Sequence, residues 1–387
     1  MRDIRRWVTP MRGREADEEN RAATPLELFF DLVIVVAIAA AASSLHHGIA
    51  EDHILESILG YVMTFFAIWW AWMSFTWHAA GYDNDDVPYR VAVFVQMAGA
   101  IIIAAGISRA FDDGDWSLVL LGYIVMRLAL IAQWLRAARD DPSHRSTNLT
   151  WAIGTAVMQV LWILAFLWIP GELFVVAFFV LLLGELSVPI VATRRQPARW
   201  HSEHIAERYG LLTIIVLGES VLAGAIAFTS VADDAFSDLE LLFLAVGALL
   251  LVFTMWWLYF ERHTDDLLTT RGRAFEWGYG HYFIWAAAAA VGAGIAVGVD
   301  VLTDHADVDM TVAGAAVAVP VAIFLAGIWV LHDVPRPMPG WRMALSPIAI
   351  FLVLLTPLTP QPILLTGVVV VGLLAAKIAT QSQAEAA

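Results

Sequence analysis

A succession of long apolar stretches constrains this chain more than any other feature of its sequence. A helix needs about twenty mostly apolar residues to cross the hydrocarbon core of a bilayer. Stretches of this kind lie near residues 27–45, 57–77, 87–108, 116–135, 149–169, 172–192, 208–229, 239–260, 278–299, 311–331, 343–358 and 361–380. We therefore expect an all-α fold, a polytopic membrane protein with about twelve transmembrane helices.

The composition agrees with a chain that lipid surrounds. Of its 387 residues, 60% are hydrophobic and 15% are charged, and the mean hydropathy is +0.71. A soluble domain usually carries about a quarter of charged residues. The absence of cysteine excludes disulfides and cysteine-based metal or redox centres. A net charge of −15 without any basic domain argues against nucleic acid as a partner.

The basic residues predict which side of the membrane each loop faces. If the N-terminus lies inside, the inner segments hold all but two of the 22 lysines and arginines. The exceptions are Arg109, in an outer loop, and Arg127, within a span. Because cytoplasmic loops carry the excess of basic residues, we expect a multi-pass plasma-membrane protein with both termini cytoplasmic. The tails would cover residues 1–25 and 381–387, and a cytoplasmic linker residues 193–207. No cleavable signal peptide is expected in the first tail.

The predicted outer loops are acidic instead. Their carboxylates are Glu51, Asp52, Asp112, Asp113, Asp115, Asp233, Asp234, Asp304, Asp307 and Asp309. Such a distribution can concentrate cations at an outer mouth. It is also what an ordinary solvated surface presents, so the loops alone do not decide between the two interpretations.

The sequence contains signs of an internal repeat. The segment 27–36 aligns with 207–216, so that Glu27 meets Glu207 and Phe29 meets Tyr209. The following helix of each half ends in a Trp-Trp pair and an acidic loop. We therefore expect two parallel six-helix repeats, residues 26–192 and 208–380, related by a pseudo-twofold axis along the membrane normal. In such proteins the interface between repeats usually holds the substrate or ion path.

Carboxylates near the start of the first span are the first candidate site. Glu27 and Asp31 are four residues apart and share one helical face. Two close carboxylates repel each other when both are ionised, which favours binding of a proton or cation. For Glu27 there is a structural alternative, because Thr24 and Glu27 have the spacing of a capping box.

The segment 201–220 is the densest in ionisable groups. Glu207 and Arg208 are expected at the inner mouth of the seventh span, and Glu219, followed by Ser220, about three turns deeper. A carboxylate at that depth must be protonated, paired or exposed to a wet cavity. His204 and Glu207 could together bind a metal on one face, but two ligands are too few to predict one. We expect no metal and no cofactor.

Arg127 and Glu185 are the remaining charges within apolar spans. An arginine in lipid requires a carboxylate partner, and Asp31, Glu185 and Glu219 are the candidates. The pair could be a structural salt bridge or a substrate contact. The Trp-rich stretch 69–77 could stack on a ring, but tryptophan near a helix end is more often an interfacial anchor.

Three motifs resemble those of a known family. They are Ala23-Thr-Pro-Leu-Glu-Leu-Phe-Phe-Asp-Leu-Val33, Asp83-Asn-Asp-Asp-Val87 and Glu207-Arg-Tyr-Gly-Leu-Leu-Thr-Ile-Ile-Val-Leu-Gly-Glu-Ser220. They are similar to motifs of the bacterial low temperature requirement protein A family, over about residues 20–380. This resemblance implies a multi-pass membrane protein and a growth phenotype in the cold, without a settled biochemical activity. The run 26–34 also resembles the first-helix signature of endolysosomal-type potassium channels, although Leu211 replaces the aspartate in the second half.

Three classes of function follow from these features. The leading hypothesis is a secondary transporter or permease for a small solute or cation, with Asp31, Glu207 and Glu219 binding the coupling proton or cation. The alternatives are a passive cation channel and a non-transporting membrane protein that acts on lipids or in envelope sensing. Neither a phosphate-binding glycine loop nor a nucleophile elbow is present, so we do not expect an enzyme. A homodimer is possible on these grounds.

Overall fold

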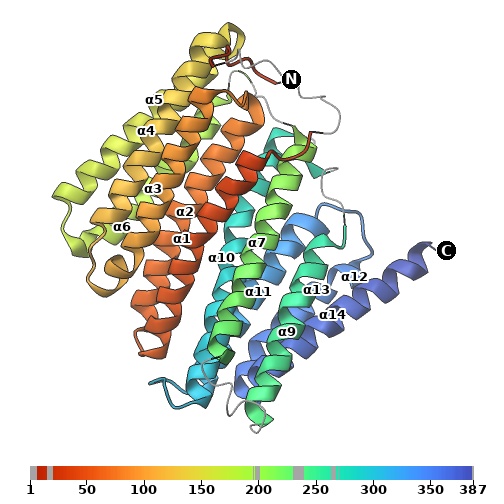
Figure 1. Cartoon of the computed structure of the whole chain (residues 1–387). Helices are drawn as coiled ribbons and strands as arrows, with labels where there is room; N and C mark the ends of the chain where they lie inside the picture. Colours follow the sequence, from red (N-terminus) through yellow and green to blue (C-terminus); the bar gives the residue numbers. More distant parts are fainter. Residues whose placement is uncertain are drawn as a thin grey trace. The chain divides into compact units, whose positions relative to one another are not determined.

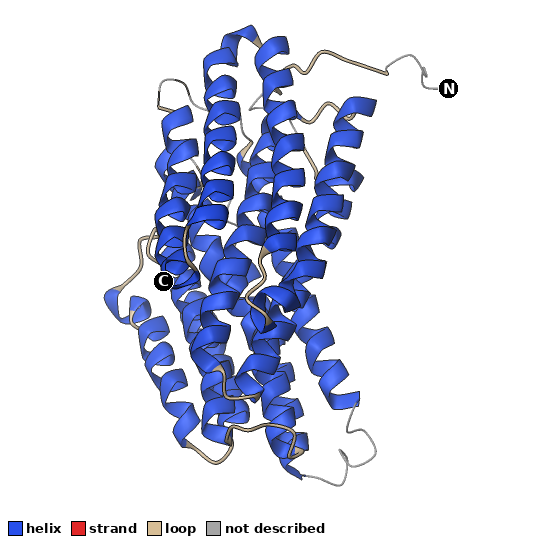
Figure 2. Cartoon of the chain, turned by 90° about the vertical axis from the view of Figure 1, so that its left-hand side faces the viewer, coloured by secondary structure: helices blue, strands red, loops and turns tan. Residues whose placement is uncertain are grey.

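The computed structural model describes residues 7–14, 21–194, 196, 201–229, 239–262, 267–268 and 270–385. In this part of the chain twelve helices are long and apolar enough to cross a membrane, and no strand occurs (Figure 2). The all-α polytopic fold expected from the sequence is therefore confirmed. The acidic segments at 233–234 and 265–266 lie outside the described residues.

The helices follow the apolar stretches closely. They are α1 (Pro25–Ala50), α2 (Ile54–Tyr82), α3 (Val87–Asp112), α4 (Ser117–Asp140), α5 (Arg145–Trp168), α6 (Gly171–Ala192), α7 (Ser202–Thr229), α9 (Leu239–Phe260), α10 (Arg271–Leu302), α11 (Met310–Ile328), α12 (Gly340–Met343), α13 (Leu345–Leu355) and α14 (Pro362–Glu385). A π-helical turn at Trp329–Asp333 extends α11, and a 3-10 turn at Thr356–Leu358 extends α13. The helix α12, α13 and that 3-10 turn together form one span.

Local side-chain caps fix several helix starts. Asp86 accepts a hydrogen bond from the Tyr89 N–H at the start of α3, and Thr270 and Asp309 cap α10 and α11 in the same way. Such caps satisfy backbone donors that have no partner inside the helix. The Asp83-Asn-Asp-Asp-Val87 motif thus has a structural task, because it ends the loop between α2 and α3 with a cap.

The chain divides into two compact units, each described here by itself. Unit 1 comprises residues 1–37 and 66–209, and unit 2 comprises residues 38–65 and 210–387. The helices α1, α2 and α7 each contribute to both units. This division rests on where the chain is compact, and compactness does not test internal symmetry. The two six-helix repeats, residues 26–192 and 208–380, therefore stay a prediction.

In unit 1, α3 packs on α4, α4 on α5 and α5 on α6 (Figure 1). The closest approach joins Gly99 of α3 to Gly122 of α4: a Cβ added at Gly122 would lie 2.5 Å from the Gly99 carbonyl oxygen. Small residues at such crossings allow the close packing that holds membrane helices together. The segment before α1 is tied to the same unit, since Arg136 of α4 donates to the Thr9 carbonyl at 2.6 Å and also pairs with Asp86.

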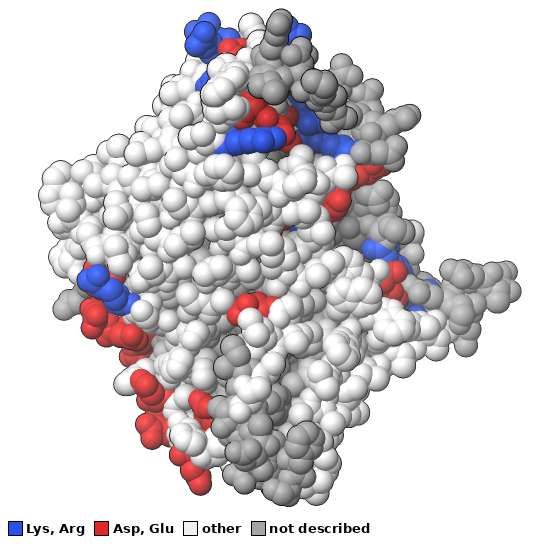
Figure 3. All heavy atoms as spheres, in the orientation of Figure 1, with Lys and Arg blue, Asp and Glu red and all other residues white. Residues whose placement is uncertain are grey.

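Most basic side chains of unit 1 lie at one end of its helices, where Asp85 and Asp86 pair with two of them, and the other end is mainly acidic (Figure 3). Arg90, Arg136, Arg139 and Arg145 lie at the end where α2 leads into α3, whereas Asp112, Asp113 and Asp115 lie at the other end with Arg109. Along the helices between these ends, large apolar side chains such as Phe94, Leu128 and Leu183 are exposed. A face of this kind fits hydrocarbon rather than water.

In unit 2, α10 is the most deeply buried span, with 83% of its most apolar window inside the protein. It packs on α11 and α9, and α9 packs on α14. The first part of α2 is fastened to α10 by two tyrosines: Tyr61 donates to the Ala286 carbonyl at 2.7 Å and Tyr282 to the Val62 carbonyl at 2.9 Å. The alanine and glycine content of α10 explains its position, because neighbouring backbones can approach it closely.

Candidate functional site

Unit 1 buries a cluster of four ionisable side chains at the starts of α1 and α7. Glu27 and Asp31 come from α1, and His204 and Arg208 from α7. Each pair is four residues apart, so each occupies a single helical face. The side chains of all four are 0–1% exposed. The cluster thus brings together three of the residues singled out from the sequence, Glu27, Asp31 and Arg208, and adds His204.

Arg208 connects the two carboxylates. Its Nη1 lies 2.7 Å from Glu27 Oε1 and its Nη2 2.5 Å from Asp31 Oδ1. Asp31 Oδ1 also accepts a hydrogen bond from the indole N–H of Trp72 at 2.7 Å. The Trp72 ring flanks the guanidinium, with its centroid 5.7 Å from Arg208 Cζ. Charge-assisted hydrogen bonds of this kind are strong in a dry environment.

Glu27 has a second, structural task. Its carboxylate accepts hydrogen bonds from the Thr24 N–H at 2.9 Å and the Thr24 hydroxyl at 3.1 Å, while the Thr24 Oγ1 accepts from the Glu27 N–H at 3.3 Å. This is the capping box that the Thr24 and Glu27 spacing predicts. The structural and the ionic interpretation of Glu27 therefore both hold, since its carboxylate also faces Arg208 and His204.

The charges in direct contact within this cluster do not balance. Two carboxylates face one guanidinium, and the fourth member is His204, whose Nε2 lies 3.3 Å from the Glu27 carboxylate. If His204 is neutral, the four side chains carry one excess negative charge, and one bound proton cancels it. Asp31 Oδ2 and His204 Nδ1 are buried and have no hydrogen-bond partner in the described part of the chain. Both atoms are therefore places where a proton or a small ligand can be held.

The groups around the cluster lie at the end of α2 and in the segment before α1. Arg21 donates to the carbonyl oxygens of Ala79 and Ala80, and Arg14 Nη1 lies 3.9 Å from Asp83 Oδ2. Burial, together with the charge of Glu27, raises the pKa of Asp83 to about 6. Charge on Asp83 is therefore disfavoured beside a cluster that is already rich in carboxylates.

Arg127 and Glu185 form a separate buried pair in unit 1. Arg127 Nη2 lies 2.9 Å from Glu185 Oε2 and donates to the Tyr123 hydroxyl at 2.6 Å. Trp70 donates to Glu185 Oε2 at 2.8 Å, and Trp162 to Glu185 Oε1 at 3.1 Å. One cation here meets one anion, and both carboxylate oxygens have donors. Of the three acids that could have paired with Arg127, the structure selects Glu185.

The tryptophans of α2 have a role that the sequence did not reveal. Trp70 and Trp72 are 2% and 0% exposed, which contradicts the expectation of interfacial anchors. Each indole N–H instead donates to a buried carboxylate, Glu185 or Asp31. Because an indole offers one donor on a large apolar ring, it suits a carboxylate inside an apolar bundle. The signal available in the sequence was their spacing of two residues, which places them on different faces of one helix.

Unit 2 holds Glu219, which lines a cavity of about 460 Å³. The cavity is bounded by α1, α7 and α10, and most of its lining is alanine. Its other ionisable lining residues are His46, His47 and Asp300. His46 Nε2 lies 2.6 Å from Asp300 Oδ2, so Asp300 has a partner. Glu219 has no ion-pair or hydrogen-bond partner within the described residues.

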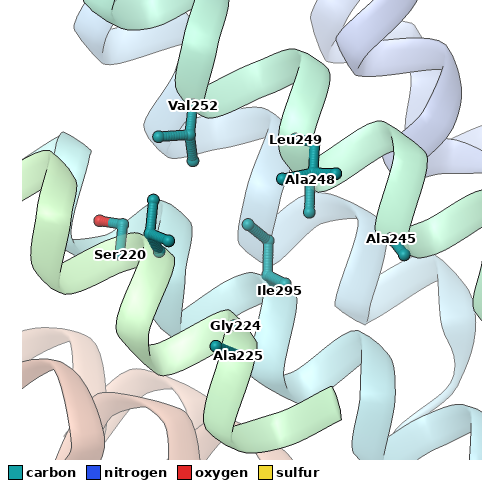
Figure 4. A pocket seen from close by; sticks show the side chains of 9 residues that line it. Ser220, Gly224, Ala225, Ala245, Ala248, Leu249, Val252 and Ile295 are labelled. Carbon is teal, nitrogen blue, oxygen red and sulfur yellow. The ribbon is translucent and has the colours of Figure 1, made fainter.

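Ser220 lines a second, smaller and apolar cavity of about 190 Å³ between α7, α9 and α10 (Figure 4). Its hydroxyl donates to the Ala288 carbonyl at 2.8 Å and contacts the Val216 carbonyl at 3.2 Å. Close packing of α7 on α10 explains this bond, because a Cβ added at Gly292 would lie 2.9 Å from Ser220 Cα. Ser220 thus joins two helices through a backbone acceptor.

The predicted site residues therefore occupy separate places. Glu27, Asp31 and Arg208 form one cluster, Arg127 and Glu185 a second, and Glu219 lines a cavity of unit 2. Glu207 is bound to the segment before α1, since its Oε2 accepts from the Ala23 N–H at 2.9 Å. Arg208 is fully buried, and its expected position at an inner mouth stays a prediction. No group of three metal-ligating side chains occurs among the described residues, and His204 contacts Glu27.

Two further aspartates form ion pairs that were not expected from the sequence. Asp300 of α10 pairs with His46, and Asp333 pairs with Lys377 at 2.6 Å. Asp333 lies in the π-helical turn and also accepts from Ser346 at 3.2 Å. In the sequence both aspartates stand at the end of an apolar stretch, where they are indistinguishable from loop residues.

Twelve apolar spans with ionisable side chains buried inside helical units define a class, the polytopic α-helical membrane proteins. Within that class, the chain matches the family model described as Bacterial low temperature requirement A protein (LtrA) over residues 22–377, and it belongs to that family. It is 30% identical over 260 residues to "Uncharacterized protein RA0937" of Rhizobium meliloti (strain 1021). That match covers 64% of this chain and 60% of the relative. No solved structure matches the chain.

Proposed function

We propose that the chain is a secondary transporter of the plasma membrane that couples the passage of a small solute or cation to the binding of a proton. The supporting observation is the buried cluster of Glu27, Asp31, His204 and Arg208, in which two carboxylates contact a single guanidinium. Charge is costly inside an apolar bundle, so an unbalanced cluster favours whichever bound species restores neutrality.

The Arg127–Glu185 pair is the internal reference for this argument. It has the same burial and the same kinds of side chain, but its charges are equal and its carboxylate oxygens are fully bonded. Because such a pair is already neutral, binding a further proton would leave it with an excess positive charge. We therefore assign a structural role to Arg127 and Glu185, and a coupling role to Asp31 with His204.

The proposed orientation gives the cluster access to a proton source. With both termini cytoplasmic, as the distribution of arginines indicates, the starts of α1 and α7 lie near the inner surface. The groups that surround the cluster there are Arg14, Arg21 and Asp83. A proton reaching the cluster from the cytoplasm would pass among these side chains.

The test is uptake into liposomes that contain the purified full-length protein and a pH-sensitive dye. The panel of probes comprises alkali-metal chlorides, neutral amino acids, monosaccharides and primary alkylamines. We expect at least one probe to enter only when the protein is present and to move protons with it. Asp31→Asn should remove the proton movement, because Glu27 and Arg208 then balance without a bound proton. Glu276→Gln, an exposed charge on α10, is the matched control.

Each other outcome contradicts a different part of this proposal. Cation flux that persists without proton movement, in wild type and Asp31→Asn alike, would identify a passive channel. If no probe enters faster than in protein-free liposomes, the transport hypothesis fails and a non-transporting membrane role takes its place. Unchanged proton coupling in Asp31→Asn would leave a transporter but remove the cluster from its mechanism.

A further inference from the structure

We infer that the cavity beside Glu219 binds a primary alkylammonium cation, with the ammonium group on Glu219 and the alkyl chain against the alanines. This inference rests on the proposed transport function, because it names the class of solute that such a transporter would carry. It is argued from the lining of the cavity in unit 2 alone.

The charges of the cavity select a cation. Glu219 lies within the span Ser202–Ala225 and has no partner among the described residues, whereas Asp300 is already held by His46 at 2.6 Å. Among the described residues, no arginine or lysine lines the cavity. A ligand with one positive charge would therefore pair with Glu219, whereas the Glu219 carboxylate would repel an anion.

The rest of the lining selects an organic cation over an inorganic one. A bare metal ion needs about six or more oxygen ligands to replace its water. Apart from Glu219, the side-chain oxygens of the described lining belong to Ser43 and to Asp300, which His46 already holds, and most of the lining is alanine. The described residues contain no group of three metal-ligating side chains. An ammonium group carries its own alkyl substituent and needs only a few acceptors. The methyl groups of the alanines supply the apolar contact that an alkyl chain requires.

The dimensions of the cavity fit a chain of a few carbons. A volume of about 460 Å³ is far larger than one ion and falls in the usual range for small-molecule sites. Glu219 adjoins Ser220, which packs on Gly292, while Asp300 lies further along α10. At the rise of an α-helix, the distance from Gly292 to Asp300 is about 12 Å. The ammonium would thus lie at the Glu219 end, and the chain would lie along the alanines between Glu219 and the His46–Asp300 pair.

The experiment measures binding of n-butylammonium to the purified full-length protein in detergent by equilibrium dialysis with labelled ligand. n-Butanol, butyrate and potassium chloride are the neutral, anionic and inorganic comparison probes. We expect saturable binding of one butylammonium per chain and none of the other three. Glu219→Gln should weaken binding by about 10-fold or more, because the ammonium group loses a charge-assisted hydrogen bond to a half-buried carboxylate. Glu276→Gln should bind as wild type does.

A second variant keeps the inference testable if Glu219→Gln does not fold. Ala223→Leu retains the carboxylate but fills part of the cavity, so it should weaken butylammonium binding more than methylammonium binding. Equal binding of butanol, tighter binding of potassium, or unchanged affinity in Glu219→Gln would each overturn the inference. Proton-coupled uptake of another probe without butylammonium binding would refute this solute class and leave transport standing. Binding of butylammonium without uptake of any probe would support this binding site and refute the transport function.

Discussion

Replacing Arg208 tests whether the charges of the buried cluster depend on each other as the distances imply. In Arg208→Met, Glu27 and Asp31 lose the guanidinium that contacts them at 2.7 and 2.5 Å, the only one to do so among the described residues, and they stay buried. Removing one partner of a buried ion pair typically costs about 3–5 kcal/mol, because the remaining charge is left without compensation. Here two buried carboxylates lose their ion-pair partner, so we expect a loss of unfolding free energy at the upper end of that range.

Comparison variants separate this charge effect from lost packing. Asp31→Asn leaves Glu27 paired with Arg208 and should cost only about 1.5–3 kcal/mol, the value of a hydrogen bond to a charged group. In Glu27→Gln/Asp31→Asn/Arg208→Met no charge remains, so the loss should fall well below that of Arg208→Met alone. The expected order of stability is wild type, Asp31→Asn, the triple variant and Arg208→Met.

The assay is unfolding of each purified variant by sodium dodecyl sulfate in mixed micelles, followed by the fluorescence of its tryptophans. Non-additivity between Asp31→Asn and Arg208→Met measures their coupling directly. Arg208→Met with a loss below about 1 kcal/mol, or equal to that of Asp31→Asn, would refute an ion-paired cluster and point to charges that water reaches.

Two further predictions concern unit 1. In the same micelle assay, Arg127→Leu should lower the unfolding free energy by about 3–5 kcal/mol. Arg127→Leu/Glu185→Leu should recover much of that loss, because no unpaired charge then remains. A double variant as unstable as Arg127→Leu would contradict this. The second concerns Asp83, whose pKa is raised from 3.8 to about 6. The folded protein therefore binds the extra proton between these values, so this residue lowers stability as pH rises from about 4 to about 6. The unfolding free energy of wild type minus that of Asp83→Asn should therefore fall over this pH range. A difference that does not change with pH would contradict the burial of Asp83.

The sequence specified the helices well because their cause is local. About twenty apolar residues in a row satisfy both the bilayer and the backbone, so spans such as 239–260 could be read without knowledge of their neighbours. The capping box of Thr24 and Glu27 is equally local, and it occurs as its spacing predicts. The family that contiguous motifs suggested is likewise confirmed by the family model that matches residues 22–377.

Pairings between distant helices could not be derived in the same way. Asp31 and Arg208 are 177 residues apart, and nothing in one sequence states which faces of α1 and α7 meet. Arg127 had three possible acids, and only the packing of its neighbours leads it to Glu185. The cavity beside Glu219 was also hidden, because it arises from small side chains on three separate helices. The sequence gives the positions of the alanines at 39, 40, 223, 293 and 296, but it does not tell that they line one cavity.

The most direct test of the account is the number of protons moved per solute, obtained from the reversal potential of uptake in liposomes. The probe is whichever solute the panel identifies, and the comparison is between wild type and Asp31→Asn. If the cluster couples transport through its one unbalanced charge, wild type moves one proton per solute and Asp31→Asn moves none. The same ratio in both proteins would contradict the central claim.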